Sequence, residues 1–113
     1  MPRRPPPRPG QPVRGSSTGR PVVAAMDLLG RRWALRILWE LRDEGAGPRA
    51  LLERVDGLSS SVLYDRLREL GEARLVERSD DGYRLTPTGR DLRDAIAPLS
   101  AWAERWAVVL REG

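Results

Sequence analysis

The chain is 113 residues long, which suits a single domain, and 40% of its residues are apolar, enough for a modest hydrophobic core. It has no cysteine and no histidine, so disulfides, thiol catalysis, Cys/His zinc sites and Ser-His-Asp triads are excluded. The sequence also has no phosphate-cradling GxxxxGK loop and no metal-ligand spacing. We therefore expect no catalytic residue, no metal and no cofactor, and an enzymatic function ranks below a binding function.

The positive charge is concentrated at the N-terminus. The chain has 20 arginines, no lysine and 16 acidic residues, giving a formal net charge of +4. Five arginines and none of the acids lie in residues 1–21, so residues 22–113 carry a net charge of −1. A basic folded domain is therefore not indicated, and a nucleic-acid surface requires local clustering of arginines.

Residues 1–20 are predicted to form a disordered arm rich in proline and arginine. Seven of the ten prolines lie in residues 1–21, where the only apolar side chains are Met1 and Val13. Such a segment buries too little apolar surface to offset its ordering entropy, so it is either a solvated leader or a nonspecific phosphate-binding arm. It lacks the apolar core of a signal peptide, and no run of about 18 apolar residues follows. We expect a cytoplasmic protein with no membrane partner.

From residue 21 onward, apolar residues recur at spacings of three and four, which predicts one folded helical domain over 21–113. The pattern is interrupted near Gly30, and Pro48 suits the first turn of a new short helix. Ser59 is a natural N-cap for the next helix. The helices predicted in this way span residues 21–29, 31–43, 48–55 and 59–72.

The last third of the chain predicts a β-hairpin followed by a long helix. Two short strands, 75–79 and 83–86, are joined by Asp-Asp-Gly at 80–82, and Asp-Gly is a strong turn signal. Thr86 is an N-cap followed by proline, which opens a final amphipathic helix. Pro98 should kink that helix.

This order of elements is typical of a winged helix-turn-helix, a mainly α fold with a small antiparallel β-hairpin. The second helix of the pair, here 59–72, enters the major groove of double-stranded DNA in that fold. With the leucines facing the core, the helix turns polar side chains outward that suit base and phosphate contacts, although Asp65 is repelled by the duplex unless it accepts from cytosine or orients an arginine. The predicted DNA contacts on and before this helix are Arg49, Ser59, Ser60, Ser61, Tyr64, Asp65 and Arg68.

The hairpin is expected to act as the wing. Arg78 and Arg84 flank its turn and are the natural contacts to phosphate or to the minor groove. The alternative is that Arg78 pairs with Glu77 or Asp80 at the surface, which contributes little. A mixed Ser/Arg face on a helix is also often plain solvated surface, so the order of elements carries the DNA prediction.

A homodimer is predicted from the large apolar residues at both ends of the domain. They exceed what a core of this size hides, and leftover apolar patches mark partner surfaces. The alternative is that Trp33 and Trp39 fill the core while the later tryptophans merely cover it. In a dimer the recognition helices would enter major grooves roughly 34–36 Å apart. The predicted dimer residues are Val22, Val23, Met26, Leu99, Trp102, Trp106 and Val109.

Several segments from about Arg20 to Val109 follow the pattern of one family. They are PVVAAMDLLGRRW at 21–33, ILWEL at 37–41, LSSSVLYDRLRELGEARLVER at 58–78, YRLTPTG at 83–89, and the late Trp102 and Trp106. In this order they resemble the HxlR-type winged-helix transcriptional regulators of bacteria, within the broader MarR-like group. The resemblance implies a dimeric repressor or activator on a pseudo-palindromic operator, with dimer contacts from the first and last helices.

Two features depart from the pattern of that family. Members usually carry a cysteine just before the first Pro-Val, and some use it to sense electrophiles or oxidants; this chain has Arg20 there, which excludes cysteine-based sensing. The hairpin turn is also trimmed to residues 79–82, where relatives tend to have a longer loop, so its reach into the minor groove is in question.

The leading hypothesis is a sequence-specific DNA-binding regulator, a repressor acting as a homodimer. One alternative is a winged helix that has lost specific DNA binding and works as a protein-interaction module, which the −1 core and the acids on the recognition face would allow. Another is a regulator that responds to a small apolar or aromatic effector in a pocket at the dimer interface, although an apolar stripe is more often core than pocket. Steep salt dependence of DNA affinity separates the first two.

Overall fold

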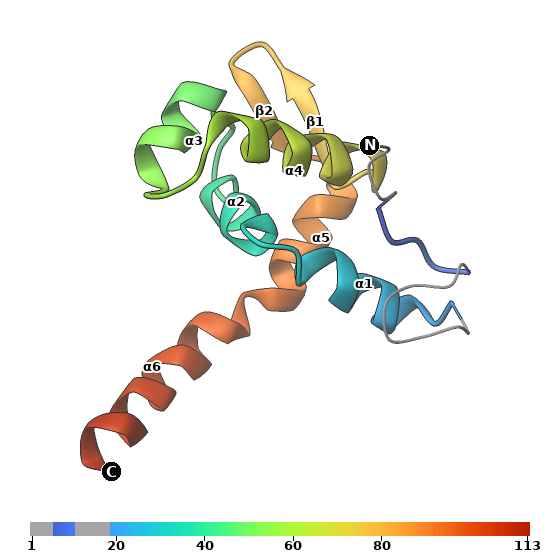
Figure 1. Cartoon of the computed structure of the whole chain (residues 1–113). Helices are drawn as coiled ribbons and strands as arrows, with labels where there is room; N and C mark the ends of the chain where they lie inside the picture. Colours follow the sequence, from blue (N-terminus) through green and yellow to red (C-terminus); the bar gives the residue numbers. More distant parts are fainter. Residues whose placement is uncertain (1–5, 11–18) are drawn as a thin grey trace.

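The computed structural model describes residues 6–10 and 19–113. Its elements follow the predicted order, and the predicted fold class, mainly α with a two-stranded antiparallel hairpin, is confirmed (Figure 1). In the described part of the chain, no helix is both long and apolar enough to cross a membrane. The elements are α1 (Pro21–Leu29), α2 (Ala34–Glu40), α3 (Pro48–Arg54), α4 (Ser60–Glu72), β1 (Val76–Ser79), β2 (Gly82–Leu85), α5 (Pro87–Ile96) and α6 (Pro98–Glu112).

The hydrophobic core lies where α2, α3, α4 and the hairpin meet. The leucine stripe predicted along α4 faces inward, as expected, and it packs against buried residues of the other elements. Full burial of an aliphatic side chain contributes roughly 1.5–3 kcal/mol, so this cluster is the main source of stability. Its largest fully buried members are Ile37, Leu41, Leu51, Val55, Leu63 and Leu70.

The second helix is shorter than the 31–43 predicted. α2 begins at Ala34, because Trp33 at its N-cap has a left-handed backbone with φ of 76°. That conformation lies outside the helical region and turns the chain between α1 and α2. The turn over residues 30–33 lets Ala34 and Ile37 enter the core while α1 keeps its own direction.

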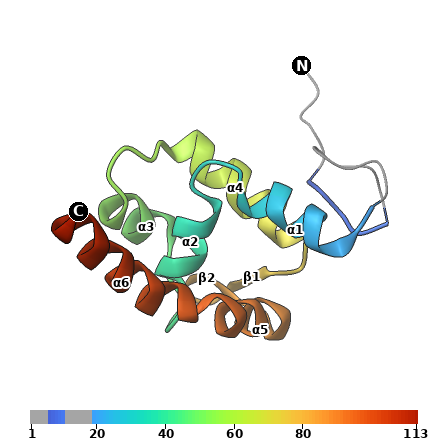
Figure 2. The same cartoon turned by 90° about the horizontal axis from the view of Figure 1, so that it is seen from below.

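The predicted kinked helix is instead two helices. α5 ends at Ile96 and α6 begins at Pro98, with Ala97 between them. Proline has no N–H to donate to the preceding turn and its ring clashes with that turn, so the break falls where the kink was expected. Figure 1 shows α6 running away from the rest of the domain, and Figure 2 shows the same helix from below. None of the residues described in α6 is buried.

The hairpin is anchored to the helical body at its turn. Its register pairs Val76 with Leu85 and Ser79 with Gly82. Both ends of each strand lie within one residue of the predicted bounds, 75–79 and 83–86. Tyr83 also forms a β-bridge with Ala46 in the loop after α2. Gly82 has a φ of 133°, and a Cβ added there would lie 2.5 Å from the Ala46 carbonyl oxygen, so only glycine fits.

The expected disordered arm falls mostly outside the described residues. Where the arm is described, Arg8 donates from a guanidinium nitrogen to the Glu72 carbonyl oxygen at 3.2 Å, at the C-terminal end of α4. The Gly10 N–H donates to the Gly19 carbonyl oxygen at 2.8 Å.

Candidate nucleic-acid interface

The helix pair formed by α3 and α4 is built around a tight turn. Leu51 and Val55 hold α3 in the core, and Gly57 takes a φ of 87° that other residues rarely adopt. Leu58 is buried directly after the turn, which fixes the point at which α4 begins. The turn therefore sets the path of the chain into α4.

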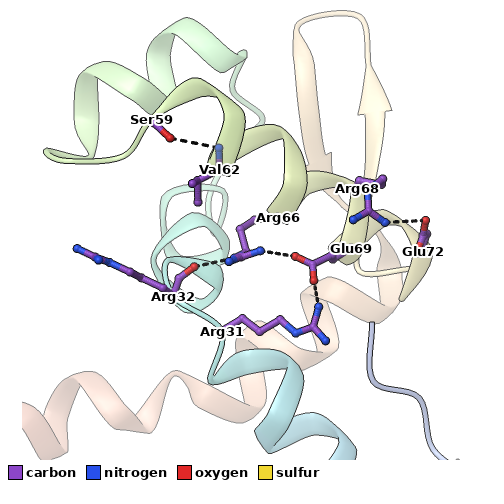
Figure 3. Close-up of polar contacts among 8 residues, drawn as sticks. All are labelled: Arg31, Arg32, Ser59, Val62, Arg66, Arg68, Glu69 and Glu72. Atoms are coloured by element: carbon purple, nitrogen blue, oxygen red, sulfur yellow. Dashed lines mark hydrogen bonds and ion pairs between the residues drawn. The ribbon is translucent and has the colours of Figure 1, made fainter. Parts of the chain in front are cut away.

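Ser59 caps α4, as its sequence position predicts. Its hydroxyl accepts a hydrogen bond from the Val62 N–H at 3.3 Å (Figure 3). The same hydroxyl lies 3.4 Å from the hydroxyl of Ser61. The N-cap bond satisfies one of the backbone donors left free at a helix start. Ser59 thus has a structural role, while its exposure leaves the hydroxyl within reach of a partner.

The outward face of α4 carries the side chains expected there. Ser60 and Ser61 are exposed, Tyr64 is 51% exposed, and Asp65 is partly buried. One turn further along, Arg68 donates to Glu72 at 3.2 Å, while its buried Nε atom has no hydrogen-bond partner among the described residues (Figure 3). The guanidinium of Arg68 is thus only partly satisfied within the domain.

The two wing arginines have different environments. Arg84 donates to Glu77 at 2.8 Å across the hairpin, while the guanidinium carbon of Arg78 lies 5.5 Å from the centre of the Tyr83 ring. Glu77 pairs with Arg84 and not with Arg78, as one alternative had it, because the hairpin register places Arg84 directly opposite Glu77. Arg78 is exposed, so its charge is open to a partner.

A hollow of about 380 Å³ lies between α4 and the hairpin and brings three of the predicted DNA contacts together. Tyr64, Arg68 and Arg78 line it, and Tyr83 joins them, a residue that the sequence did not single out. The feature of the sequence that could have identified Tyr83 is its position opposite Arg78 in the predicted hairpin. Arg49 and Arg84 are exposed outside this hollow, Arg49 in the first turn of α3.

The residues predicted to form the dimer leave a large apolar surface exposed. Val22 and Met26 of α1 are exposed, Val23 is partly buried, and the α6 members Leu99 and Val109 are exposed. Trp102 and Trp106 are 48% and 51% exposed and stack on each other with ring centres 5.5 Å apart. The sequence missed two further exposed residues of α6, Val108 and Leu110.

The alternative placement of the tryptophans is partly wrong. Trp33 packs against the core, but Trp39 is exposed and carries the Arg42 guanidinium over its ring at 3.9 Å. Trp102 and Trp106 do not cover the domain core, because α6 extends beyond it (Figure 1).

The helix pair, the following hairpin and the polar outer face of α4 define a winged helix-turn-helix domain. The family model described as HxlR-like helix-turn-helix matches residues 28–110. The chain therefore belongs to the HxlR-like helix-turn-helix family.

Relatives in this family are transcriptional regulators by name. An uncharacterised HTH-type transcriptional regulator of Mycobacterium tuberculosis is 40% identical over 101 residues, covering 81% of this chain and 60% of that protein. This chain thus spans less than two thirds of that relative. The HTH-type transcriptional regulator YodB of Bacillus subtilis is 30% identical over 92 residues, covering 75% of this chain and 82% of YodB.

Solved structures agree with this membership. The quinone-bound structure of YodB from B. subtilis has a TM-score of 0.69 at 32% identity, covering 74% of this chain and 96% of that chain. A possible HxlR family transcriptional factor from Thermoplasma volcanium has a TM-score of 0.64 at 26% identity, covering 79% of this chain and 83% of that chain.

Proposed function

We propose that this chain is a sequence-specific DNA-binding transcriptional regulator that acts as a homodimer on a pseudo-palindromic operator. The observation that carries the proposal is the hollow between α4 and the hairpin, where Tyr64, Arg68 and Arg78 converge on one face. A recognition helix and a wing that share one face can straddle a DNA strand, with the helix in the major groove. Because the proposed partner is DNA, we place the action of the protein in the cytoplasm.

Arg68 on α4 and Arg84 on the wing are held by exposed ion pairs that DNA groups can replace. The exposed ion pair between Arg68 and Glu72 is worth at most about 0.5 kcal/mol, so a phosphate or a guanine edge can replace the carboxylate at little cost. Arg84 and Glu77 form a similar exposed pair on the wing. We assign base contacts to the N-terminal half of α4 and to Arg68, and phosphate or minor-groove contacts to Arg49, Arg78 and Arg84.

The dimer is the second part of the proposal, and α6 supports it. An isolated helix of this length is marginal in water, because most helical stability in proteins comes from packing of an apolar face. The exposed face of α6, with Trp102 and Trp106 stacked on it, supplies such a surface. A two-fold arrangement of two copies would cover it and pair two recognition helices with two half-sites.

Repression is the simplest consequence of a dimer that occupies an operator, because bound protein blocks access to that DNA. The competing interaction module would keep the fold and lose specific DNA binding. The acids Asp65 and Glu72 on α4 are the features that favour this competitor.

The test is selection of bound genomic fragments by the purified chain, repeated with Arg68→Ala. We expect an inverted repeat that is enriched by the wild type and lost or altered with Arg68→Ala, and an affinity that falls steeply with salt as counterions are released. Deletion of residues 1–20 should weaken binding without changing the motif if the arm holds phosphates. A folded dimer that enriches no motif and shows no salt dependence would favour the interaction module.

An effector-responsive version of the same regulator is favoured by a pocket at the base of α6. The pocket has a volume of about 270 Å³, and its lining combines apolar residues with two arginines and two aspartates: Leu38, Trp39, Leu92, Ile96, Arg42, Arg93, Asp43 and Asp94. Its lining suits a small apolar or aromatic molecule, and its position between the domain and α6 would link occupancy to the dimer. Loss of operator binding when such a molecule is added, and its rescue by Trp39→Ala, would support this version.

A further inference from the structure

One carboxylate of the recognition helix is buried on the side that faces away from the proposed DNA surface. Among residues 6–10 and 19–113, Glu69 is the one charged residue that is buried, with 3% of its surface exposed. Taking a carboxylate out of water is costly, so such a group persists only where it is paired and hydrogen-bonded. Its surroundings therefore identify a place where α4 is held firmly.

Both carboxylate oxygens of Glu69 are paired with arginines. Oε1 accepts from Arg66 on the same helix at 2.5 Å, and Oε2 forms a close ion pair with Arg31 in the turn between α1 and α2 (Figure 3). Arg66 also donates from Nε to the Arg32 carbonyl oxygen at 2.8 Å. The side chains of Arg31 and Arg66 are 15% and 22% exposed, so solvent screens the cluster weakly.

The cluster ties α4 to a turn that also packs against the chain before α4. Trp33 closes that turn in its left-handed conformation, and its indole ring lies against Gly57, where an added Cβ would be 3.6 Å from the ring. The turn over residues 30–33 therefore touches the chain before α4 and the last third of α4. It also directly follows α1, which carries the exposed Val22 and Met26 of the proposed dimer surface.

We propose that Glu69 is a positioning residue that fixes the angle between the recognition helix α4 and helix α1, and thereby the half-site spacing that the dimer accepts. This inference rests on the proposed DNA-binding function. The ion pairs of Glu69 with Arg31 and Arg66 hold the C-terminal part of α4 in place. The N-terminal turns of α4, at the other end of the helix, contact the bases.

A small rotation of α4 about Glu69 displaces the N-terminal end of the helix by a distance that matters for DNA binding. Glu69 lies nine positions after Ser60, which at 1.5 Å per residue is about 13 Å of helix. A rotation of about 15° at Glu69 would move Ser60 by about 3.4 Å, the rise of one base pair. Loss of the Glu69 ion pairs should therefore widen the range of half-site spacings that the dimer accepts by about one base pair in either direction.

A direct test needs no DNA. The chain has no cysteine, so spin labels can be attached uniquely at Ala25→Cys on α1 and Ser60→Cys on α4. The distance distribution between them, measured in labelled chains diluted with unlabelled protein, should be narrow in the parent and broadened or shifted by Glu69→Gln. An unchanged distribution with Glu69→Gln would overturn the proposal.

The functional test uses inverted repeats whose spacer varies one base pair at a time. We expect one preferred spacing for the parent and for Glu53→Gln, a control that replaces an exposed carboxylate of α3. With Glu69→Gln we expect an affinity loss of about tenfold at that spacing and near-equal binding at neighbouring spacings. The salt dependence of nonspecific binding should stay the same, which a general loss of structure would not allow.

The remaining outcomes are also decisive. Arg31→Gln removes one of the two cationic partners and should give the same broadening if Glu69→Gln fails to fold. Unfolding of both variants would assign Glu69 to stability alone and overturn the proposal. If the parent selects no inverted repeat, the DNA-binding function fails, while the spin-label distances still decide whether Glu69 positions α4.

Discussion

Helices α4 and α6 are similar in length and carry similar apolar stripes, yet they end in opposite environments. The α4 stripe is covered by the core of its own chain, and its Leu63 and Leu70 have no exposed surface. The α6 stripe contains two tryptophans and is exposed throughout. Apolar periodicity therefore predicts that a helix forms, while the surrounding elements decide whether the chain itself covers the apolar face.

The largest difference in folding stability should come from the covered stripe. Leu63→Ala removes a fully buried side chain and leaves a cavity, so we expect the free energy of unfolding to fall by about 3 kcal/mol in urea titrations. The control Leu35→Ala changes an exposed leucine of α2 and should cost below about 1 kcal/mol. Equal losses in the two variants would mean that α4 is not packed as described.

The uncovered stripe should matter for association instead. Trp106→Ala is expected to weaken the dimer by about 2 kcal/mol, or roughly 30-fold in dissociation constant, because aromatic residues dominate interface energies. Sedimentation equilibrium measures this change, with Glu104→Ala on the same helix as the control. A monomeric parent chain, or a dimer that tolerates Trp106→Ala, would contradict the role of α6.

The start of α4 should contribute a smaller and local stabilisation. Ser59→Ala removes the hydroxyl that accepts from the Val62 N–H, so we expect a loss of about 1 kcal/mol in thermal or urea unfolding. Ser60→Ala, one residue further along, removes an exposed hydroxyl that is not the N-cap and should have an effect below about 0.5 kcal/mol. If both variants lose equal stability, the cap does not act through Ser59.

The smallest effect should come from the exposed side of α4. A double-mutant cycle with Arg68→Ala and Glu72→Gln should give a coupling energy of at most about 0.5 kcal/mol, since an exposed i,i+4 pair is screened by water. A coupling above about 1.5 kcal/mol would show that Arg68 is locked to Glu72 and not open to DNA.

Local patterns in the sequence predicted the elements whose causes are local. The leucine spacing of α4 and the Ser59 N-cap each act over a few residues, and the structure contains both. The hairpin turn predicted across residues 80–82 falls at residues 80–81, and Gly82 is the first residue of β2. The break at Pro98 was expected as a kink and is a complete interruption. The DNA and dimer residues were placed on the expected faces, although their contacts with partners stay predictions.

Features that depend on distant residues were not predictable. Arg31 and Glu69 are far apart in the sequence, and nothing in the spacing of either indicates that they pair. The left-handed Trp33 depends on how α1 and α2 pack, and Tyr83 joins the hollow only because the hairpin folds beside α4. These contacts arise from tertiary packing, which single-sequence periodicity does not encode.

The most direct measurement of the proposed function is the stoichiometry and affinity of the purified chain on the selected inverted repeat and on its isolated half-site. We expect two chains per full repeat and an affinity for the half-site at least about 100-fold weaker, because two linked recognition helices bind together. One chain per repeat, or equal affinity for the full and half sites, would contradict a homodimer that reads DNA through α4.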